Sequence, residues 1–352
     1  MTGQYLSGKK KIEIPDKRIL TNGNKITLFN PKKHNLKISK LDIPLGCMVA
    51  VTGVSGSGKS TLIHDVLYAH LQKYHGIMQG PSSLFDKIEG TDVIESVELV
   101  DQTPIGRSSR STPVTYTKVF ELIRETYANT QASRQLGWRA GHFSFNIPGG
   151  RCDVCEGEGT VTVEMQFLPD VHLECEGCKG TRYKRETRQI LYKNKSIVDV
   201  LNMTIDEALI FFEEDKKIVK KLNLLHEVGL GYLKLGQPSS MLSGGESQRI
   251  KLAAHLESNA NMHKLFIFDE PTTGLHLDDI SKLLTCFKKL IDSGNSIIVI
   301  EHNIHVIASA DWIIDLGPEG GEGGGEIVAT GTPEKVSQNK KSYTGQALKK
   351  YI

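Results

Sequence analysis

The chain has 352 residues and a formal net charge of +2 at pH 7, so its overall charge indicates neither an acidic nor a basic partner. It contains no run of about 18 apolar residues, which excludes a membrane-spanning helix on sequence grounds. The segment Met1–Arg18 lacks the apolar core of a secretory signal. We therefore expect a cytoplasmic protein with no membrane contact.

The six cysteines are expected to serve as metal ligands and spare residues rather than as disulfides, because disulfides are rare in the cytoplasm. Cys47 and Cys286 have no partner at the spacing of a metal site. For these two we expect small, buried apolar side chains.

A phosphate-binding loop is predicted at Gly53–Ser60, where G-V-S-G-S-G-K-S fits the pattern G-x-x-x-x-G-K-[ST]. The apolar run Cys47–Thr52 before it predicts a buried strand, and Thr61–Tyr74 after it has helical spacing. Loop N–H groups and the positive end of the helix would hold ATP phosphates, Lys59 would reach the β- and γ-phosphates, and Ser60 would ligate Mg²⁺. The candidate residues here are Gly53, Ser55, Gly56, Gly58, Lys59, Ser60 and Thr61.

The segment from about Val100 to Ser240 is predicted to be a module inserted into the ATP-binding core. It contains two C-x-x-C pairs separated by the nineteen residues Glu156–Glu174. Two such pairs supply the four thiolates of a tetrahedral zinc site, while a disulfide or redox pair is the alternative. The candidate ligands are Cys152, Cys155, Cys175 and Cys178.

Basic residues flank the cysteine pairs on both sides, and few acidic residues oppose them. Such flanks beside a rigid metal site would suit the phosphate backbone of DNA, although a solvated charged face is the alternative. The residues before the pairs are Arg107, Arg110, Lys118, Arg124, Arg134, Arg139 and Arg151. Those after them are Lys179, Arg182, Lys184, Arg185, Arg188, Lys193 and Lys195.

Further phosphate contacts are predicted at the run LSGGESQR, Leu242–Arg249. Ser243 is expected to cap a helix, and Gly244 and Gly245 would let the backbone approach a phosphate closely.

Two more apolar strands are predicted to end in chemically active residues. After the strand in Lys264–Pro271, Asp269 would hold Mg²⁺ and Glu270 would orient or deprotonate the attacking water. After the strand in Asn295–His302, His302 would contact the γ-phosphate. A solvated turn and a structural histidine are the alternatives.

The remaining elements complete an α/β pattern, with a helix at Leu277–Ile291, a strand in Asp311–Pro318 and a glycine-rich loop at Gly317–Glu326. Strands alternating with helices predict a parallel sheet whose chemistry lies at the carboxyl ends of its strands. The expected parts are residues 1–100 and 241–352 for the ATPase core and 101–240 for the inserted zinc-binding, DNA-contacting module.

Together, the phosphate-binding loop, the LSGGE run, DEPTTGL and the downstream histidine resemble the ABC ATPase superfamily. The resemblance implies that two cassettes meet head to tail, with Ser243–Glu246 of one closing over the nucleotide held by the other. It also assigns Gln102, in VDQTPIG, to the glutamine loop that links metal and γ-phosphate to neighbouring domains.

Longer segments resemble the UvrA family of bacterial nucleotide excision repair. They are Val100–Phe120, the cysteine module with FLPDV inside it, Leu230–Ala253 and Phe268–His276. The resemblance implies an ATPase that binds double-stranded DNA, preferentially damaged, within an excision-nuclease system linked to the SOS response, without nuclease activity of its own. UvrA carries two cassettes and this chain one, so a second cassette is expected from a homodimer or a missing N-terminal half, and any UvrB-type partner only indirectly.

Three other functions remain open on the sequence. A half-size UvrA-like ATPase for self-resistance to DNA-binding drugs would share every motif. A transporter nucleotide-binding subunit would not carry the cysteine module. A DnaJ-like zinc module would explain the cysteine pairs but not the ATP motifs.

Overall fold

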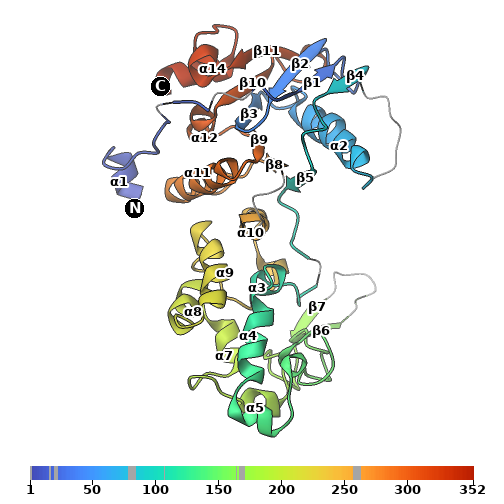
Figure 1. Cartoon of the computed structure of the whole chain (residues 1–352), viewed down its shortest axis with the longest axis vertical. Coiled ribbons are helices and arrows are strands. Elements are labelled where there is room, and N and C mark those ends of the chain that lie inside the picture. Colours follow the sequence, from blue (N-terminus) through green and yellow to red (C-terminus); the bar gives the residue numbers. More distant parts are fainter. Residues whose placement is uncertain are drawn as a thin grey trace. The chain divides into compact units, whose positions relative to one another are not determined.

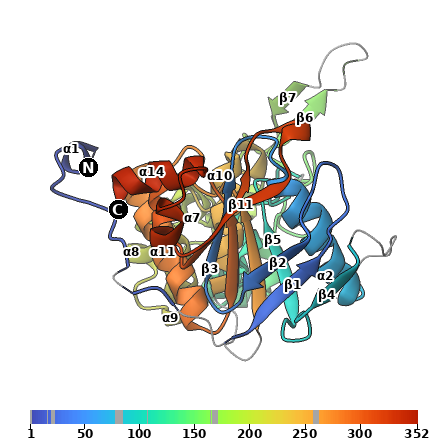
Figure 2. The ribbon, with the colours of Figure 1, turned by 90° about the horizontal axis from the view of Figure 1, so that it is seen from above.

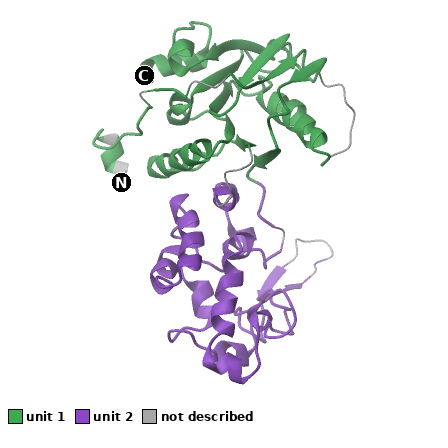
Figure 3. Cartoon of the chain, in the orientation of Figure 1, with its two compact units in different colours: residues 1–102, 258–352 green, residues 103–257 purple. Residues whose placement is uncertain are grey.

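The computed structural model describes the chain except residues 1, 16, 20–22, 78–84, 107, 164, 166–170 and 257–262. The chain divides into two compact units, drawn in two colours in Figure 3. Unit 1 comprises Met1–Gln102 and Ser258–Ile352, and unit 2 comprises Thr103–Glu257. The run Leu242–Arg249 lies in unit 2, although it was predicted to belong to the C-terminal part of the core.

Unit 1 is built on a six-stranded sheet with the order β11–β10–β3–β9–β8–β5. Neighbouring strands from β10 to β5 pair in parallel, and β11 pairs antiparallel with β10 at one edge. The strands expected around residues 47–52, 264–271, 295–302 and 311–318 are thereby confirmed. The bounds are β3 (Met48–Gly53), β5 (Ser96–Val100), β8 (Lys264–Asp269), β9 (Ser296–Ile300), β10 (Trp312–Gly317) and β11 (Glu326–Gly331).

Helices cover both faces of this sheet, with α2 on one face and α11 and α14 on the other (Figure 2). A smaller antiparallel sheet has the order β2–β1–β4. The remaining elements of unit 1 are α1 (Thr2–Leu6), β1 (Lys25–Phe29), β2 (Lys40–Pro44), the π-helical η1 (Thr61–Tyr68), α2 (Ala69–Tyr74), β4 (Lys87–Glu89), α11 (Leu277–Asp292), α12 (Ile304–Ser309), the 3₁₀ turn η4 (Gly321–Gly323), α13 (Pro333–Ser337) and α14 (Tyr343–Tyr351).

The central strands are buried along their whole length because helices lie over both faces. All five residues of β9 are buried, and Val49 and Val51 of β3 pack with Leu62 and Val66 of the following helix. This burial explains why these strands are continuous apolar runs rather than alternating ones. Parallel pairing also brings the carboxyl ends of β3, β8 and β9 to the same edge of the sheet.

Unit 2 is mainly helical and contains a two-stranded antiparallel sheet, β6–β7 (Figure 1), whose second strand ends directly before Cys175. Its elements are α3 (Pro113–Tyr116), α4 (Val119–Ala128), α5 (Gln131–Gln135), η2 (Ala140–Phe143), β6 (Thr160–Val163), β7 (Val171–Glu174), α6 (Arg185–Gln189), α7 (Ile197–Asn202), α8 (Ile205–Phe211), α9 (Lys216–Glu227), η3 (Ser239–Met241) and α10 (Gly244–Leu256). Part of the segment Glu156–Glu174 between the cysteine pairs thus forms strands, and Phe167–Asp170 of FLPDV lie outside the described residues.

Candidate nucleotide site and cysteine cluster

The loop Gly53–Ser60 joins the end of β3 to η1, in the strand-to-helix context that the motif requires. Gly53 has a φ of +133°, and a Cβ added to it would lie 2.0 Å from the backbone oxygen of Leu316. Only glycine therefore fits where the loop leaves the sheet.

The glycine-rich tract Gly317–Glu326 packs against this loop, a contact that the sequence analysis did not predict. Gly321 N–H donates to Gly56 O (3.0 Å), and Gly325 N–H donates to Ser57 O (3.1 Å). Asn35 Nδ2 donates to both Gly56 O (3.2 Å) and Gly321 O (2.7 Å). These bonds satisfy backbone carbonyl groups of the phosphate-binding loop. They thereby fix the loop conformation in which successive N–H groups form an anion-binding nest.

Lys59 is folded over the start of its own loop. Its Nζ donates to Gly53 O (3.0 Å) and Val54 O (2.9 Å), and the residue is 6% exposed. Burial lowers the pKa of Lys59, and the charges of Glu270 and Asp269 oppose that shift.

The predicted catalytic residues come together at the carboxyl ends of β8 and β9. Glu270 N–H donates to Ile300 O (2.9 Å), and Gln102 Nε2 donates to Glu270 O (3.3 Å). His302 Nε2 lies 3.7 Å from Glu270 Oε1. Glu270 has a φ of +45°, a left-handed conformation that is unusual for glutamate and is often found at functional sites.

His64 is a member of this cluster that the sequence analysis missed. Its Nε2 lies 3.1 Å from Asp269 Oδ2, and this neighbouring carboxylate is the main reason that the pKa of His64 is raised. His64 could have been predicted as a site residue from its spacing in the sequence. It follows Ser60 by four residues at the start of a helix, so the two side chains lie on the same face of that helix.

The LSGGE run begins α10 as expected, and the predicted cap at Ser243 is confirmed. Ser243 Oγ accepts from Glu246 N–H (3.2 Å), while Glu246 Oε2 accepts from Ser243 N–H (2.7 Å). This reciprocal pair is a capping box. Tyr232 OH also donates to Glu246 Oε1 (2.7 Å), so a residue outside the motif helps to hold it.

The four predicted metal ligands in unit 2 form one cluster. Cys152, Cys155, Cys175 and Cys178 are buried, and their Sγ atoms lie within 4.8 Å of one another. Cys152 Sγ is 3.9 Å from Cys175 Sγ, and Cys155 Sγ is 3.6 Å from Cys178 Sγ. Thiolates about 2.3 Å from a tetrahedral zinc ion lie about 3.8 Å apart, so the spacing fits zinc. Gly159 N–H donates to Cys155 Sγ (3.3 Å), so a backbone group also faces the cluster.

Several predicted DNA-contacting residues have partners within unit 2. Arg182 is 8% exposed and lies over the ring of Phe145, while Arg110, Arg151, Lys184 and Lys193 form ion pairs with nearby carboxylates. Arg107 lies outside the described residues. The exposed members of the two flanks are Lys118, Arg134, Arg139, Lys179, Arg185, Lys193 and Lys195.

Unit 1 contains a strand–loop–helix phosphate site and an acidic pair at the end of a parallel strand. Together with the helix that begins at the LSGGE run, these features define an ABC-type ATP-binding fold with an inserted cysteine module. No protein-family model matches the chain. All 352 residues align with UvrABC system protein A, at 55% identity in Aquifex aeolicus (strain VF5) and 52% in Clostridium perfringens (strain 13 / Type A), covering 38% of each.

The structure is similar to that of UvrA2 from Deinococcus radiodurans, with a TM-score of 0.90 and 44% identity. The match covers 99% of this chain and 42% of that one. This chain therefore matches one part of UvrA, as the motifs indicated, and it spans about two fifths of the length of these relatives. Among the residues that the structure describes, no helix is long and apolar enough to cross a membrane.

Proposed function

We propose that the chain is an ATP-hydrolysing, DNA-binding cassette of UvrA type that acts in damage recognition for nucleotide excision repair. The observation that carries this proposal is the convergence of Gln102, Asp269, Glu270 and His302 beside a phosphate-binding loop. The cysteine module in the same chain favours a UvrA-type role over a transporter subunit.

Each residue of the nucleotide site has a chemically distinct proposed role. Lys59 binds the β- and γ-phosphates, and the hard oxygens of Ser60 and Asp269 suit Mg²⁺, which would neutralise phosphate charge. Glu270 orients or deprotonates the attacking water, and His302 contacts the γ-phosphate. Gln102 joins this group through its bond to the Glu270 backbone.

Replacing Lys59 with alanine should weaken ATP binding by about 30-fold to several thousand-fold. The loss of one member of a desolvated charge pair costs about 2–5 kcal/mol, which corresponds to that range of affinity. Equilibrium binding of ATP measures the effect, with Lys40→Ala as the control because Lys40 is an exposed lysine on β2. A Lys59→Ala chain that binds ATP as tightly as the wild type would contradict the proposed site.

The run Ser243–Glu246 is proposed to act on the nucleotide of a second cassette, supplied by another copy or by an N-terminal half. Specific ATPase activity should therefore rise several-fold with protein concentration. Adding a Lys59→Ala chain, which keeps its own Ser243–Glu246 run, should activate dilute wild-type chain. Constant turnover by a chain shown to be monomeric would rule out this assembly.

The proposed substrate of unit 2 is double-stranded DNA, with a preference for damaged DNA. A lesion alters the energy needed to deform the duplex, which a protein can sense without reading base edges. Lys179, Arg185 and Lys195 are exposed and lie after the cysteine cluster, where they can contact phosphates. UvrB-type partners are proposed to join only indirectly, and the proposed location is the cytoplasm.

A further inference from the structure

Glu301 is a buried carboxylate that belongs to none of the predicted motifs. It follows β9, directly precedes His302, and is only 2% exposed. A carboxylate is expensive to bury unless hydrogen bonds replace its lost hydration. The groups that donate hydrogen bonds to Glu301 therefore indicate its role in the fold.

The two oxygens of Glu301 bind two different turns. Oε1 accepts from the N–H (3.0 Å) and the hydroxyl (2.5 Å) of Thr272, in the turn after β8. Oε2 accepts from the N–H groups of His302 (2.7 Å) and Asn303 (2.8 Å), in the turn after β9. These three backbone N–H groups and one hydroxyl satisfy both oxygens of the buried side chain and join the two turns through it.

These two turns carry the two side chains nearest to the proposed reaction. Glu270 lies two residues before Thr272, and His302 directly follows Glu301. Their side chains approach within 3.7 Å but are each about half exposed, so packing alone does not hold them. The backbone bond from Glu270 N–H to Ile300 O joins the same turns at one further point.

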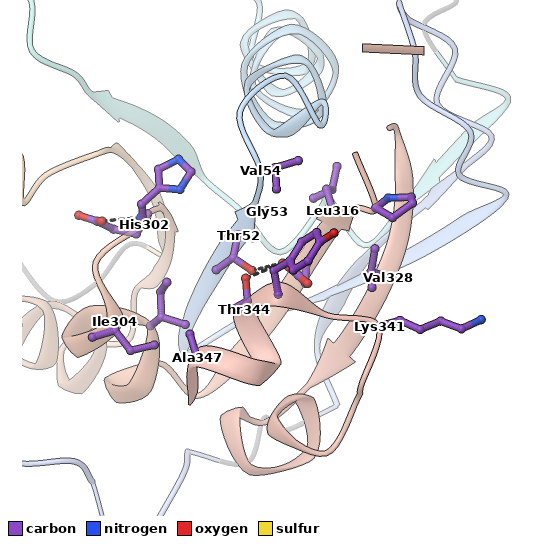
Figure 4. A pocket seen from close by; sticks show the side chains of 15 residues that line it. Thr52, Gly53, Val54, His302, Ile304, Leu316, Val328, Lys341, Thr344 and Ala347 are labelled. Carbon is purple, nitrogen blue, oxygen red and sulfur yellow. Dashed lines mark hydrogen bonds between the residues drawn. The ribbon is translucent and has the colours of Figure 1, made fainter. Parts of the chain in front are cut away.

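His302 also borders a cavity of about 260 Å³, whose lining includes Gly53, Glu301 and Thr344 (Figure 4). Asp315 also lines the cavity, and its Oδ1 accepts from the hydroxyls of Thr52 (2.7 Å) and Thr344 (2.8 Å). On its cavity side, the histidine meets open space rather than packed atoms. Its position therefore depends on the backbone turn that Glu301 holds.

We propose that Glu301 is a positioning residue for ATP hydrolysis, whose carboxylate clamps the turns that carry Glu270 and His302 in one register. This role rests on the function proposed above. Glu301 itself does not touch the nucleotide. It acts by keeping the histidine and the water-orienting carboxylate in a fixed arrangement at the site of the γ-phosphate.

Glu301→Gln should lower kcat by about 10- to 100-fold, because small misplacement of reacting groups has effects of this size. The amide keeps the side-chain shape but replaces one acceptor by a donor, which disrupts one of the two turns. The KM for ATP and the equilibrium affinity should change by less than about threefold, because the phosphate loop is untouched.

Asp311→Asn is a matched control, because Asp311 is also a buried carboxylate (7% exposed) that accepts two backbone N–H groups, from Ile19 and Met48. It lies at the amino end of β10, away from the nucleotide edge of the sheet. This variant should keep kcat within about twofold. An equal fall in kcat in both variants would make Glu301 a purely structural residue and overturn the proposal.

Two further variants separate positioning from folding. Thr272→Val removes only one of the four donors and should lower kcat several-fold at unchanged KM, even if Glu301→Gln does not fold. In a His302→Ala background, Glu301→Gln should add less than its separate effect on kcat, because both act on the same group. Full additivity, or wild-type kcat in Thr272→Val and Glu301→Gln, would overturn this role while leaving the ATPase function intact. A wild-type chain without ATPase activity would instead overturn the proposed function, and this role with it.

Discussion

Replacing Glu270 with glutamine is expected to slow ATP turnover by about 10²- to 10⁴-fold, the usual contribution of a positioned general base. Glutamine cannot take a proton from the attacking water, although it keeps the size of the side chain. ATP affinity should stay within about threefold of the wild-type value, because Lys59 and Asp269 remain. Steady-state ATPase assays and equilibrium ATP binding measure the two effects.

The local geometry explains why this substitution should be selective. The Glu270 backbone is held by Ile300 O and by Gln102 Nε2, and its side chain is 49% exposed, so the change removes no core packing. Glu89→Gln on β4 is the control, because this carboxylate has a similar exposed fraction of 48% and lies in the smaller sheet. An equal loss of ATP affinity in Glu270→Gln and Lys59→Ala would contradict the division between binding and hydrolysis.

The central sheet could be predicted from the sequence because local patterns determine it. Uninterrupted apolar runs predicted β3, β8, β9 and β10, and the polar residues at their ends marked the edge where Asp269, Glu270 and His302 now lie. In a parallel sheet, strand ends of the same polarity must meet at one edge, so the grouping of these residues followed without knowledge of their contacts.

The contacts that support the phosphate-binding loop at this edge could not be predicted, because they join segments that are distant in the sequence. Asn35 binds Gly321 across 286 positions of the chain, and the glycine-rich tract predicted as a loop closes behind the phosphate-binding loop. At Gly325, a Cβ would lie 1.8 Å from Asn35 O, so this glycine serves close packing as well as a turn. A single sequence identifies such glycines but not the surface against which they pack.

The exposure of the basic residues around the cysteine cluster is a second feature that could not be predicted from the sequence pattern. A count of basic residues does not distinguish a buried guanidinium from an exposed one. Arg182 lies over Phe145, its Nη2 donates to Ser109 O (3.1 Å), and burial lowers its pKa, so this residue supports the module instead of forming a free charge. The residues proposed to contact DNA are therefore limited to the exposed basic residues on either side of the cysteine pairs.

Replacing Cys175 and Cys178 with serine should release one zinc ion per chain and weaken or misdirect DNA binding. The four cysteines form a buried cluster of their own, whereas Val161, Val163 and Leu173 of the β6–β7 pair are exposed. The module thus has little apolar core of its own there, and structural zinc contributes about 10–16 kcal/mol of binding free energy in small domains. Metal analysis and binding to damaged and intact duplexes, over a range of salt concentrations, measure the effects.

ATP affinity should survive in the same variant, because the phosphate loop belongs to unit 1 and the cysteines to unit 2. The control is the replacement of Cys47 and Cys286 by alanine, since both are buried but lie outside the cluster, and it should keep one zinc per chain. Wild-type affinity for DNA should fall steeply with salt if the contacts are to phosphates. Undiminished discrimination of damaged DNA after complete zinc loss would exclude the module from recognition, because without the metal the cysteine cluster would no longer fix the basic residues on either side of it.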